Sequence, residues 1–332
     1  MYSANASGVE KRVVILDPAS GTANLGDHII SEAVHRIIRD AADGCVRVLP
    51  ISVHQKPSAA QLDLMHDADV VIAGGSNLIN FRYWPLRDGR WNNSLFSLLK
   101  MKNVILLGVG ASSASDRSNL FGRYLYDSVL SRHFIHSVRD EFTANMMRGH
   151  GFSNVLNTTC PTMWSLSSAH VAEIPPFKSS KVIFTLTDYH RDYVSDKTMI
   201  SYLLNSYEEV YFWPQGYYDY KYLEELGVVS GIIVVSPDVA SFDAVISLGG
   251  IDYVGTRLHA GIRALQKKCR TIVVSIDNRA REISRDTGLV AIDRERVSSL
   301  KEIIEGDIHQ KIRLPEENIT LWKSQLKDLL RG

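Results

Sequence analysis

The chain has 332 residues, of which 45% are hydrophobic and 22% are charged, so it can bury a large core and is long enough for about two domains. Lys plus Arg and Asp plus Glu each number 37, and the resulting formal net charge of zero argues against wholesale binding to nucleic acid or to an anionic membrane. The polar first stretch, and apolar runs well short of the roughly 18 residues of a spanning helix, predict a soluble, cytoplasmic protein.

In the first half of the chain, short apolar runs alternate with amphipathic stretches. We expect strands at 12–17, 46–52, 69–75, 103–110 and 134–140. The stretches between and after them predict helices at 28–41, 94–100, 122–132 and 142–151. Continuous apolar strands that alternate with helices indicate a parallel sheet covered on both faces.

The pattern lapses near 165–180, in a polar connector that contains Pro and Ser, and then restarts. We expect further strands at 181–188, 209–215, 231–236, 251–256, 270–277 and 289–293, each except the last followed by a helix. The sequence therefore predicts an α/β protein with two Rossmann-like, doubly wound domains, 1–168 and 178–312, that face a cleft. The amphipathic segment 313–332 predicts a C-terminal helix that could pack back on the first domain.

Ligands of open parallel sheets bind beyond the carboxyl ends of the strands, so the residues that follow each strand are the candidate site. After the first strand, a loop with two glycines leads through Asn24 and Asp27 into a helix, whose first amides would attract an anion. The alternative is that Asp27 is only the helix N-cap. The Gly-x-Gly-x-x-Gly fingerprint of dinucleotide binding is absent from this loop.

The third strand is followed by a second glycine turn, Gly74-Gly75-Ser76-Asn77, which could contact a ligand or simply connect a strand to a helix. The loop 81–91 after it contains three arginines and four aromatic residues, a combination suited to sugar stacking and anion capture, or to a loop that packs its own aromatics. The aromatic segment 211–220 could line the acceptor side, with Gln215 as its candidate contact.

Arginines follow two further strands. Arg139 lies beside Asp140, either as a ligand contact or as the ion-pair partner of a helix N-cap. Arg257-Leu258-His259 lies between a strand and a helix, and Arg257 and His259 point the same way if the chain stays extended through Leu258. Arginine can bind a carboxylate or phosphate with two parallel hydrogen bonds, and histidine exchanges protons near neutral pH. The pattern favours a transferase with a small, multiply anionic substrate.

Other chemistries find less support. The three cysteines are far apart and never form Cys-x-x-Cys, which argues against a thiolate metal site and favours buried, inert thiols. The sequence lacks a carboxylate cluster, a Gly-x-Ser-x-Gly element and a P-loop.

Five segments together resemble the polysaccharide pyruvyl transferase family, in the order in which that family has them. They are Asn24–Asp27, Ala73–Ile79, Ser137–Asp140, Cys160-Pro161 and Arg257–Ile262. The resemblance covers roughly residues 12–290. The segment Ser275–Glu282 departs from the family pattern, which more often has an aromatic residue, Asp and Lys there.

The resemblance implies a glycosyltransferase-B-like fold and transfer of pyruvate from phosphoenolpyruvate to two hydroxyls of a sugar, as a cyclic ketal. The sugar would belong to a surface polysaccharide or its lipid-linked precursor in cell-envelope biosynthesis, which brings the protein near the membrane. By resemblance, Arg139 and Arg257 would bind the donor and His259 would be the acid/base, with no metal or redox cofactor. The alternatives are a nucleotide-sugar glycosyltransferase of the same fold and a non-catalytic glycan-binding protein.

Overall fold

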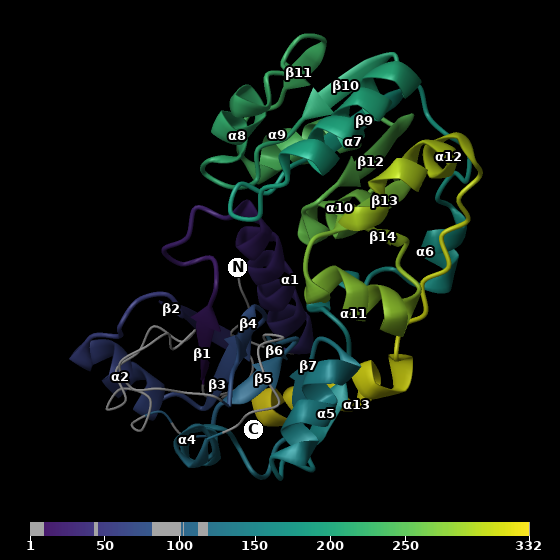
Figure 1. Cartoon of the computed structure of the whole chain (residues 1–332). Coiled ribbons are helices and arrows are strands. Elements are labelled where there is room, and N and C mark those ends of the chain that lie inside the picture. Colours follow the sequence, from purple (N-terminus) through teal and green to yellow (C-terminus); the bar gives the residue numbers. More distant parts are fainter. Residues whose placement is uncertain (1–9, 43–45, 82–100, 102, 112–118, 332) are drawn as a thin grey trace, which may run out of the picture. The chain divides into compact units, whose positions relative to one another are not determined.

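The structure is a computed structural model that describes residues 10–42, 46–81, 101, 103–111 and 119–331 (Figure 1). The helix expected at 94–100 and the arginine- and aromatic-rich loop, from residue 82 on, lie outside the described residues. So does Cys45, whereas Cys160 and Cys269 are described and are both buried.

The chain forms two compact units. Unit 1 comprises Met1–Gly21, Ser31–Pro161 and Pro315–Gly332, and unit 2 comprises Thr22–Ile30 and Thr162–Leu314. The sequence instead placed all of 1–168 in the first domain. The segment Thr22–Ile30 belongs to unit 2 because Ile29 is buried there with Ile183 and Trp213, and because the Leu25 N–H donates to the Gln215 carbonyl oxygen at 3.0 Å.

Unit 1 contains a four-stranded parallel sheet in the order β2-β1-β3-β5. These strands are β1 (Lys11–Asp17), β2 (Val46–Ser52), β3 (Val70–Gly74) and β5 (Ile105–Leu107). Two further parallel pairs join β4 (Asn77–Ile79) to β6 (Gly110–Ala111) and β7 (His136–Val138) to β8 (Val155–Asn157). The helices are α1 (Leu25–Ala41), which begins in unit 2, α2 (Ala59–His66), α4 (Leu120–Val129), α5 (Glu141–Gly149) and α13 (Glu316–Arg331).

A histidine side chain connects β5 to β7 in unit 1. The Leu106 N–H donates to His136 Nδ1 at 3.2 Å, and His136 Nε2 lies 2.8 Å from the Ser131 carbonyl oxygen. Because one nitrogen accepts and the other faces a carbonyl, the ring is neutral with its proton on Nε2. Burial lowers the pKa of His136 to about 4.

The C-terminal helix α13 is part of unit 1. Gln325 of α13 accepts from the Ile135 N–H at 2.6 Å and donates to the Ile135 carbonyl oxygen at 3.1 Å. Asn318 donates to the Asn157 carbonyl oxygen at 2.8 Å. These side-chain amides therefore connect α13 to the backbone beside β7 and at the end of β8.

Unit 2 contains a six-stranded parallel sheet in the order β11-β10-β9-β12-β13-β14 (Figure 1). The strands are β9 (Lys181–Thr185), β10 (Glu209–Phe212), β11 (Ile232–Val234), β12 (Ile251–Gly255), β13 (Thr271–Ser275) and β14 (Ala291–Asp293). Numbered within the unit, the order is 3-2-1-4-5-6, which is that of a Rossmann fold. The strand order reverses between β9 and β12.

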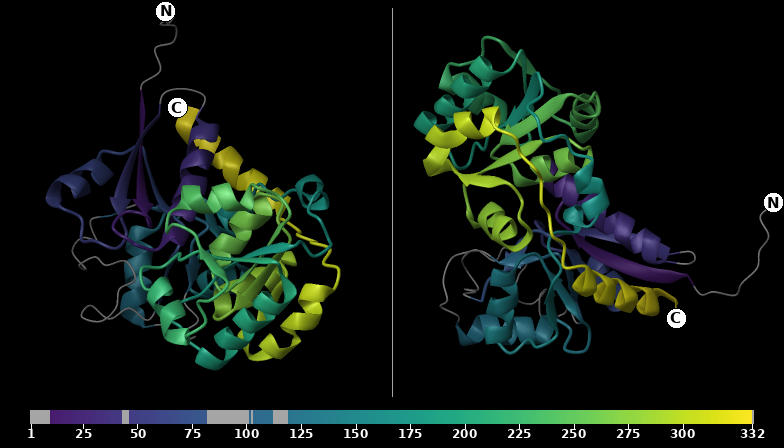
Figure 2. Two further views of the ribbon diagram at one scale, coloured as in Figure 1. Left: turned by 90° about the horizontal axis from the view of Figure 1, so that it is seen from above. Right: turned by 90° about the vertical axis from the view of Figure 1, so that its right-hand side faces the viewer.

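Helices cover both faces of this sheet. One face packs on α7 (Tyr193–Ser206), α8 (Asp219–Leu226) and α12 (Leu300–Glu305), with α7 and α12 in contact (Figure 2). The other packs on α9 (Val239–Ile246), α10 (Leu258–Gln266) and the start of α1. Successive residues of β9 show this division, since Val182 and Phe184 lie in the first core and Ile183 lies in the second.

The sequence missed several short elements. A helix, α6 (Ser168–Ala172), lies inside the expected connector, and β14 is followed by a 3-10 helix (Arg294–Ser299) and α12, where no helix was expected. The short strands β4 and β8 were also missed. In each case the element is too short for hydrophobic periodicity to reveal it.

Candidate functional site

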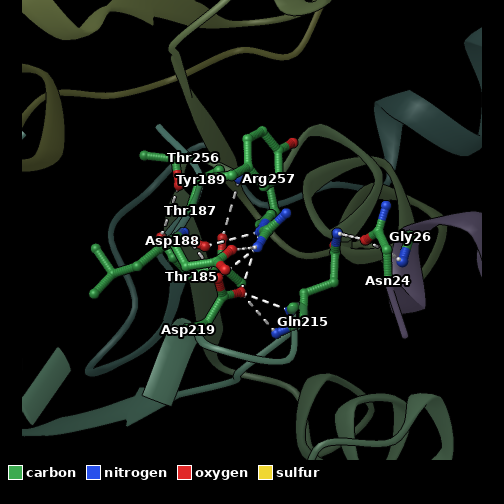
Figure 3. Close-up of polar contacts among 12 residues, drawn as sticks. Asn24, Gly26, Thr185, Thr187, Asp188, Tyr189, Gln215, Asp219, Thr256 and Arg257 are labelled. Atoms are coloured by element: carbon green, nitrogen blue, oxygen red, sulfur yellow. Dashed lines mark hydrogen bonds and ion pairs between the residues drawn. The ribbon is translucent and has the colours of Figure 1, made fainter. Parts of the chain in front are cut away.

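Arg257 lies at the point where the strand order of unit 2 reverses. It follows β12 directly and precedes α10, next to the carboxyl end of β9. The Arg257 N–H donates to Thr185 Oγ1 at 3.2 Å (Figure 3). The Tyr253 hydroxyl donates to the Arg257 carbonyl oxygen at 2.7 Å. The backbone is therefore fixed where doubly wound sheets bind their ligands.

Arg257 is only 3% exposed, and protein partners bond to two of its three guanidinium nitrogens. Nε donates to the Leu186 carbonyl oxygen at 2.8 Å and to Asp219 at 3.1 Å. Nη2 donates to Asp188 at 3.0 Å and also to Asp219 (Figure 3). Nη1 makes no hydrogen bond within the part of the chain that the structure describes.

Gly216 makes room for this guanidinium. A Cβ at residue 216 would lie 2.2 Å from Arg257 Nη2, a distance that side chains do not tolerate. Residue 216 must therefore be glycine if the Arg257 side chain is to occupy its observed position.

Asp219, the first residue of α8, holds both Arg257 and the loop before α8. Its carboxylate accepts from the N–H groups of Asp188 at 3.0 Å, Gln215 at 3.1 Å and Gly216 at 2.7 Å. Burial raises the pKa of Asp219, while Arg257 and the backbone N–H groups act in the opposite direction.

The extended backbone expected through Leu258 is wrong. Arg257 is extended, with φ −97° and ψ 102°, but α10 begins at Leu258. The helix thus begins directly after Arg257, and the first N–H groups of α10 have no partner within the helix itself. Arg257, Leu258 and His259 nevertheless line one pocket, because the turn from strand to helix brings successive side chains to the same edge of the sheet.

This pocket lies entirely within unit 2. Its empty volume is about 360 Å³, counting the part open to solvent. Besides the Arg257–His259 segment, its lining includes Asn24, Gln215, Tyr189, Asp277 and Arg279. His259 is 6% exposed, so it is available to a ligand only through a small part of its surface.

Asn24, and not Asp27, occupies the cap position of α1. The helix begins at Leu25, and Asn24 Oδ1 accepts from the Gly26 N–H at 3.2 Å. Asp27 lies in the first turn, where its carboxylate accepts from Asn24 Nδ2 at 3.0 Å. The reading of Asp27 as N-cap is therefore wrong, because the helix starts two residues before it.

Gln215 joins this network with a fixed orientation (Figure 3). Its Nε2 donates to Asn24 Oδ1 at 2.9 Å, and Asn24 Oδ1 must be an acceptor because it also faces the Gly26 N–H. Gln215 Oε1 is buried and has no hydrogen-bond partner among the residues described. The structure thus brings together five predicted residues around one pocket or its wall: Asn24, Gln215, Arg257, Leu258 and His259.

Apart from Asp27, which lies in unit 2 beside Asn24, the remaining predicted residues lie in unit 1 with Arg139. Asp140 caps α5 by accepting from the Thr143 N–H at 2.8 Å and pairs with Arg139 Nε at 3.3 Å, as its structural interpretation predicted. Arg139 Nη2 donates to Asn77 at 2.7 Å. A Cβ at Gly110 would lie 2.3 Å from that nitrogen, so this arginine also depends on a glycine.

The turn at Gly74–Asn77 does not lead into a helix. Gly75 and Ser76 both have positive φ, at 74° and 63°, and Asn77 begins β4. The Gly75 N–H donates to the Leu107 carbonyl oxygen, and the Ser76 carbonyl oxygen accepts from the Gly110 N–H, both at 2.8 Å. The turn therefore connects two strands and positions Asn77 for Arg139.

Sequence reasoning missed Tyr189, Asp188, Asp219 and Arg279. The Tyr189 ring lies 4.9 Å from the Arg257 guanidinium carbon, and its hydroxyl accepts from Arg279 Nη2 at 2.9 Å. Asp188, Tyr189 and Arg279 follow β9 and β13, so the same strand-end rule could have found them. Asp219 begins a helix after a loop, and the sequence carries no comparable signal for it.

The described residues contain neither a candidate metal site nor a helix that could span a membrane. These residues contain no group of three or more His, Cys, Asp or Glu side chains that could hold a metal ion. None of the helices described is both long and apolar enough to cross a membrane.

The whole chain is similar in fold to known sugar-nucleotide enzymes. The UDP-GlcNAc 2-epimerase of Methanocaldococcus jannaschii aligns with a TM-score of 0.55 and 12% identity, over 97% of this chain and 100% of the other. MnaA of S. aureus aligns with a TM-score of 0.56 and 10% identity, over 98% of both chains. The UDP-GlcNAc 2-epimerase of Neisseria meningitidis aligns with a TM-score of 0.52 and 11% identity, over 97% of this chain and 99% of the other.

At these identities the likeness concerns the fold alone, and it confirms the predicted pair of Rossmann-like units of the glycosyltransferase-B-like class. No curated protein sequence matches the chain. A family model, described as polysaccharide pyruvyl transferase, matches residues 24–278, which include every predicted site residue. The chain belongs to the polysaccharide pyruvyl transferase family.

Proposed function

We propose that this protein transfers pyruvate from phosphoenolpyruvate to two hydroxyls of a sugar in a surface polysaccharide or its lipid-linked precursor. Two C–O bonds form at C2 of the donor, and the bond from C2 to the phosphate oxygen breaks. One hydroxyl proton goes to C3, which becomes a methyl group, and the other leaves with phosphate. The product is a cyclic ketal.

One observation carries this proposal: Arg257 and His259 line a single pocket at the strand-order reversal of unit 2, in a member of this family. Arg257 would contact the donor through Nη1, since Nε and Nη2 already bond to protein groups. This differs from the two-nitrogen contact expected from the sequence. Asp219 and Asp188 balance the charge of Arg257, so Nη1 acts mainly as an oriented hydrogen-bond donor.

His259 would be the acid/base. Addition of an alcohol to C2 requires a proton at C3, and imidazolium is a suitable acid near neutral pH. In unit 1, Arg139 is oriented by Asn77 and Asp140, and resemblance to the family makes it a second candidate anion-binding arginine. In the unit 2 pocket, Arg257 would position the donor and stabilise the departing phosphate.

The test is release of phosphate from phosphoenolpyruvate, assayed with lipid-linked oligosaccharides and glycans as acceptors. We expect release that depends on the acceptor, and a His259→Gln variant about 10²–10⁴-fold slower, with donor affinity close to that of the wild type. His309→Gln is the matched control, because His309 is an exposed histidine of the same unit.

Two results would contradict the proposal. One is that no acceptor elicits phosphate release. The other is that calorimetry detects binding of UDP but not of phosphoenolpyruvate, which would favour the nucleotide-sugar glycosyltransferase alternative.

A further inference from the structure

Arg279 is a second arginine of the unit 2 pocket. It lies in the first turn of α11 (Asn278–Thr287), directly after β13, which pairs with β12. Arg257 and Arg279 therefore come from adjacent strand ends and line the same pocket.

The Arg279 side chain is held by the residue that caps its own helix. Asp277 Oδ1 accepts from the Arg279 N–H at 2.9 Å, and Asp277 Oδ2 accepts from Nε at 2.8 Å and from Nη2 at 2.6 Å. A guanidinium fixed along one edge loses little further freedom when its other edge binds a ligand.

Tyr189 connects the two arginines. Its ring stacks against the Arg257 guanidinium, and its hydroxyl accepts from Arg279 Nη2. Tyr189 is 59% exposed, so it stands at the open side of the pocket with one arginine against its face and the other at its hydroxyl.

In both arginines the same nitrogen remains available. Nε and Nη2 are bonded to protein groups, while Nη1 of Arg257 and Nη1 of Arg279 make no hydrogen bond in the described part of the chain. The pocket thus has two oriented N–H₂ donors separated by one tyrosine. Such a pair fits a ligand with two anionic groups, or one phosphate with several oxygens.

We propose that Arg279 is a donor-binding residue, which contacts an anionic group of phosphoenolpyruvate while Arg257 Nη1 contacts the other. The identity of the ligand as phosphoenolpyruvate rests on the proposed function. The existence of an anion site formed by the two arginines does not depend on it. Arg279 determines the specificity of the site for ligands with two anionic groups over those with one.

The test is calorimetric titration of phosphoenolpyruvate and of pyruvate into the wild type, Arg279→Gln and Arg281→Gln. Arg281 is the matched control, since it lies on the same helix, is 43% exposed and pairs with Asp293 at 2.5 Å. We expect Arg279→Gln to weaken phosphoenolpyruvate binding by about 10- to 100-fold, as for loss of a charge-assisted hydrogen bond. Arg281→Gln should bind like the wild type, and the preference for phosphoenolpyruvate over pyruvate should fall only in Arg279→Gln.

If the wild type binds phosphoenolpyruvate and Arg279→Gln binds it equally well, the Arg279 inference is overturned while the proposed function stands. If the wild type does not bind phosphoenolpyruvate, the proposed function fails, and titration of inorganic phosphate then tests the arginine pair separately. Phosphate binding that is lost in Arg279→Gln supports the anion site. Phosphate binding that is absent from the wild type, or unchanged in the variant, overturns it.

Discussion

A buried arginine paired with an aspartate lies beside each end of β12, and the two pairs differ in one respect. At the amino end, Arg270 is 1% exposed and binds Asp252 through Nη1 at 2.6 Å. Its Nε donates to the Pro176 carbonyl oxygen at 3.1 Å, and its Nη2 donates to the Gly306 carbonyl oxygen at 2.6 Å. At the carboxyl end, Arg257 is 3% exposed and leaves Nη1 without a partner among the described residues.

Burial and an acidic partner therefore do not show whether an arginine has a nitrogen left over for a ligand. The two arginines differ in whether a guanidinium nitrogen remains without a protein partner among the described residues. Arg270 uses every nitrogen, to bond to Asp252 of β12, to Pro176 and to the end of α12, whereas Arg257 is oriented by two nitrogens and presents the third. His136 belongs with Arg270, because both of its ring nitrogens are used within unit 1.

The largest expected effect comes from Arg270→Met. The substitution leaves Asp252 buried without its cation, so the free energy of unfolding should fall by about 3–5 kcal/mol. Urea denaturation of the variant, followed by circular dichroism, measures this loss. Arg257→Lys is the contrasting variant, since lysine can still pair with Asp219, and its loss should be clearly smaller; equal losses would break the comparison.

The second largest effect should be a loss of stability in acid that depends on His136. Burial lowers its pKa from an unfolded value near 6.5 to about 4, so the unfolded state binds the proton more readily. The stabilisation is complete above pH 6.5 and is lost as the pH falls from there towards 4, by about 3 kcal/mol. Unfolding measured across this range in wild type and His136→Gln tests the account, and parallel pH profiles would count against it.

Asp188→Asn should have a smaller effect, on binding. The substitution removes a negative charge that bonds to Arg257 Nη2 at 3.0 Å, so an anion at Nη1 meets less repulsion. We expect phosphoenolpyruvate affinity to rise by a few-fold, about 0.5–1 kcal/mol, and less at high salt. Calorimetry at two ionic strengths provides the measurement, and weaker binding would show that Asp188 serves mainly to position the arginine.

The smallest effect should follow Gln215→Met. The substitution removes the hydrogen bond from Gln215 Nε2 to Asn24, which destabilises the fold. It also removes a buried Oε1 that has no partner among the described residues, which acts in the opposite direction on the free energy of unfolding. We expect stability within about 1 kcal/mol of the wild type by thermal unfolding. Gln310→Met is the matched control, because Gln310 also has a buried, unpartnered Oε1, and its Nε2 donates to the Thr271 carbonyl oxygen at 2.8 Å.

The sequence predicted the parts of this molecule that depend on one stretch of chain. The β9 and β12 runs are apolar because both faces of their sheet are covered, and the strand-end rule pointed to Arg257 and His259. It could equally have pointed to Arg279 after β13. Asp219 could not be found this way, because its role arises only when α8 is brought beside β9 and β12. The cap of α1 was misplaced for a similar reason, since Asn24 is fixed partly by Gln215, which is distant in the sequence.

In the function we propose, Arg257 presents Nη1 to the donor, while Nε and Nη2 hold the side chain in place through bonds to the protein. Calorimetric titration of phosphoenolpyruvate into wild type and Arg257→Lys tests this most directly, because lysine keeps the charge beside Asp219 but has no third nitrogen to present. We expect binding to the wild type and at least about a tenfold loss in the folded variant. Equal affinity in the two proteins would contradict the claim.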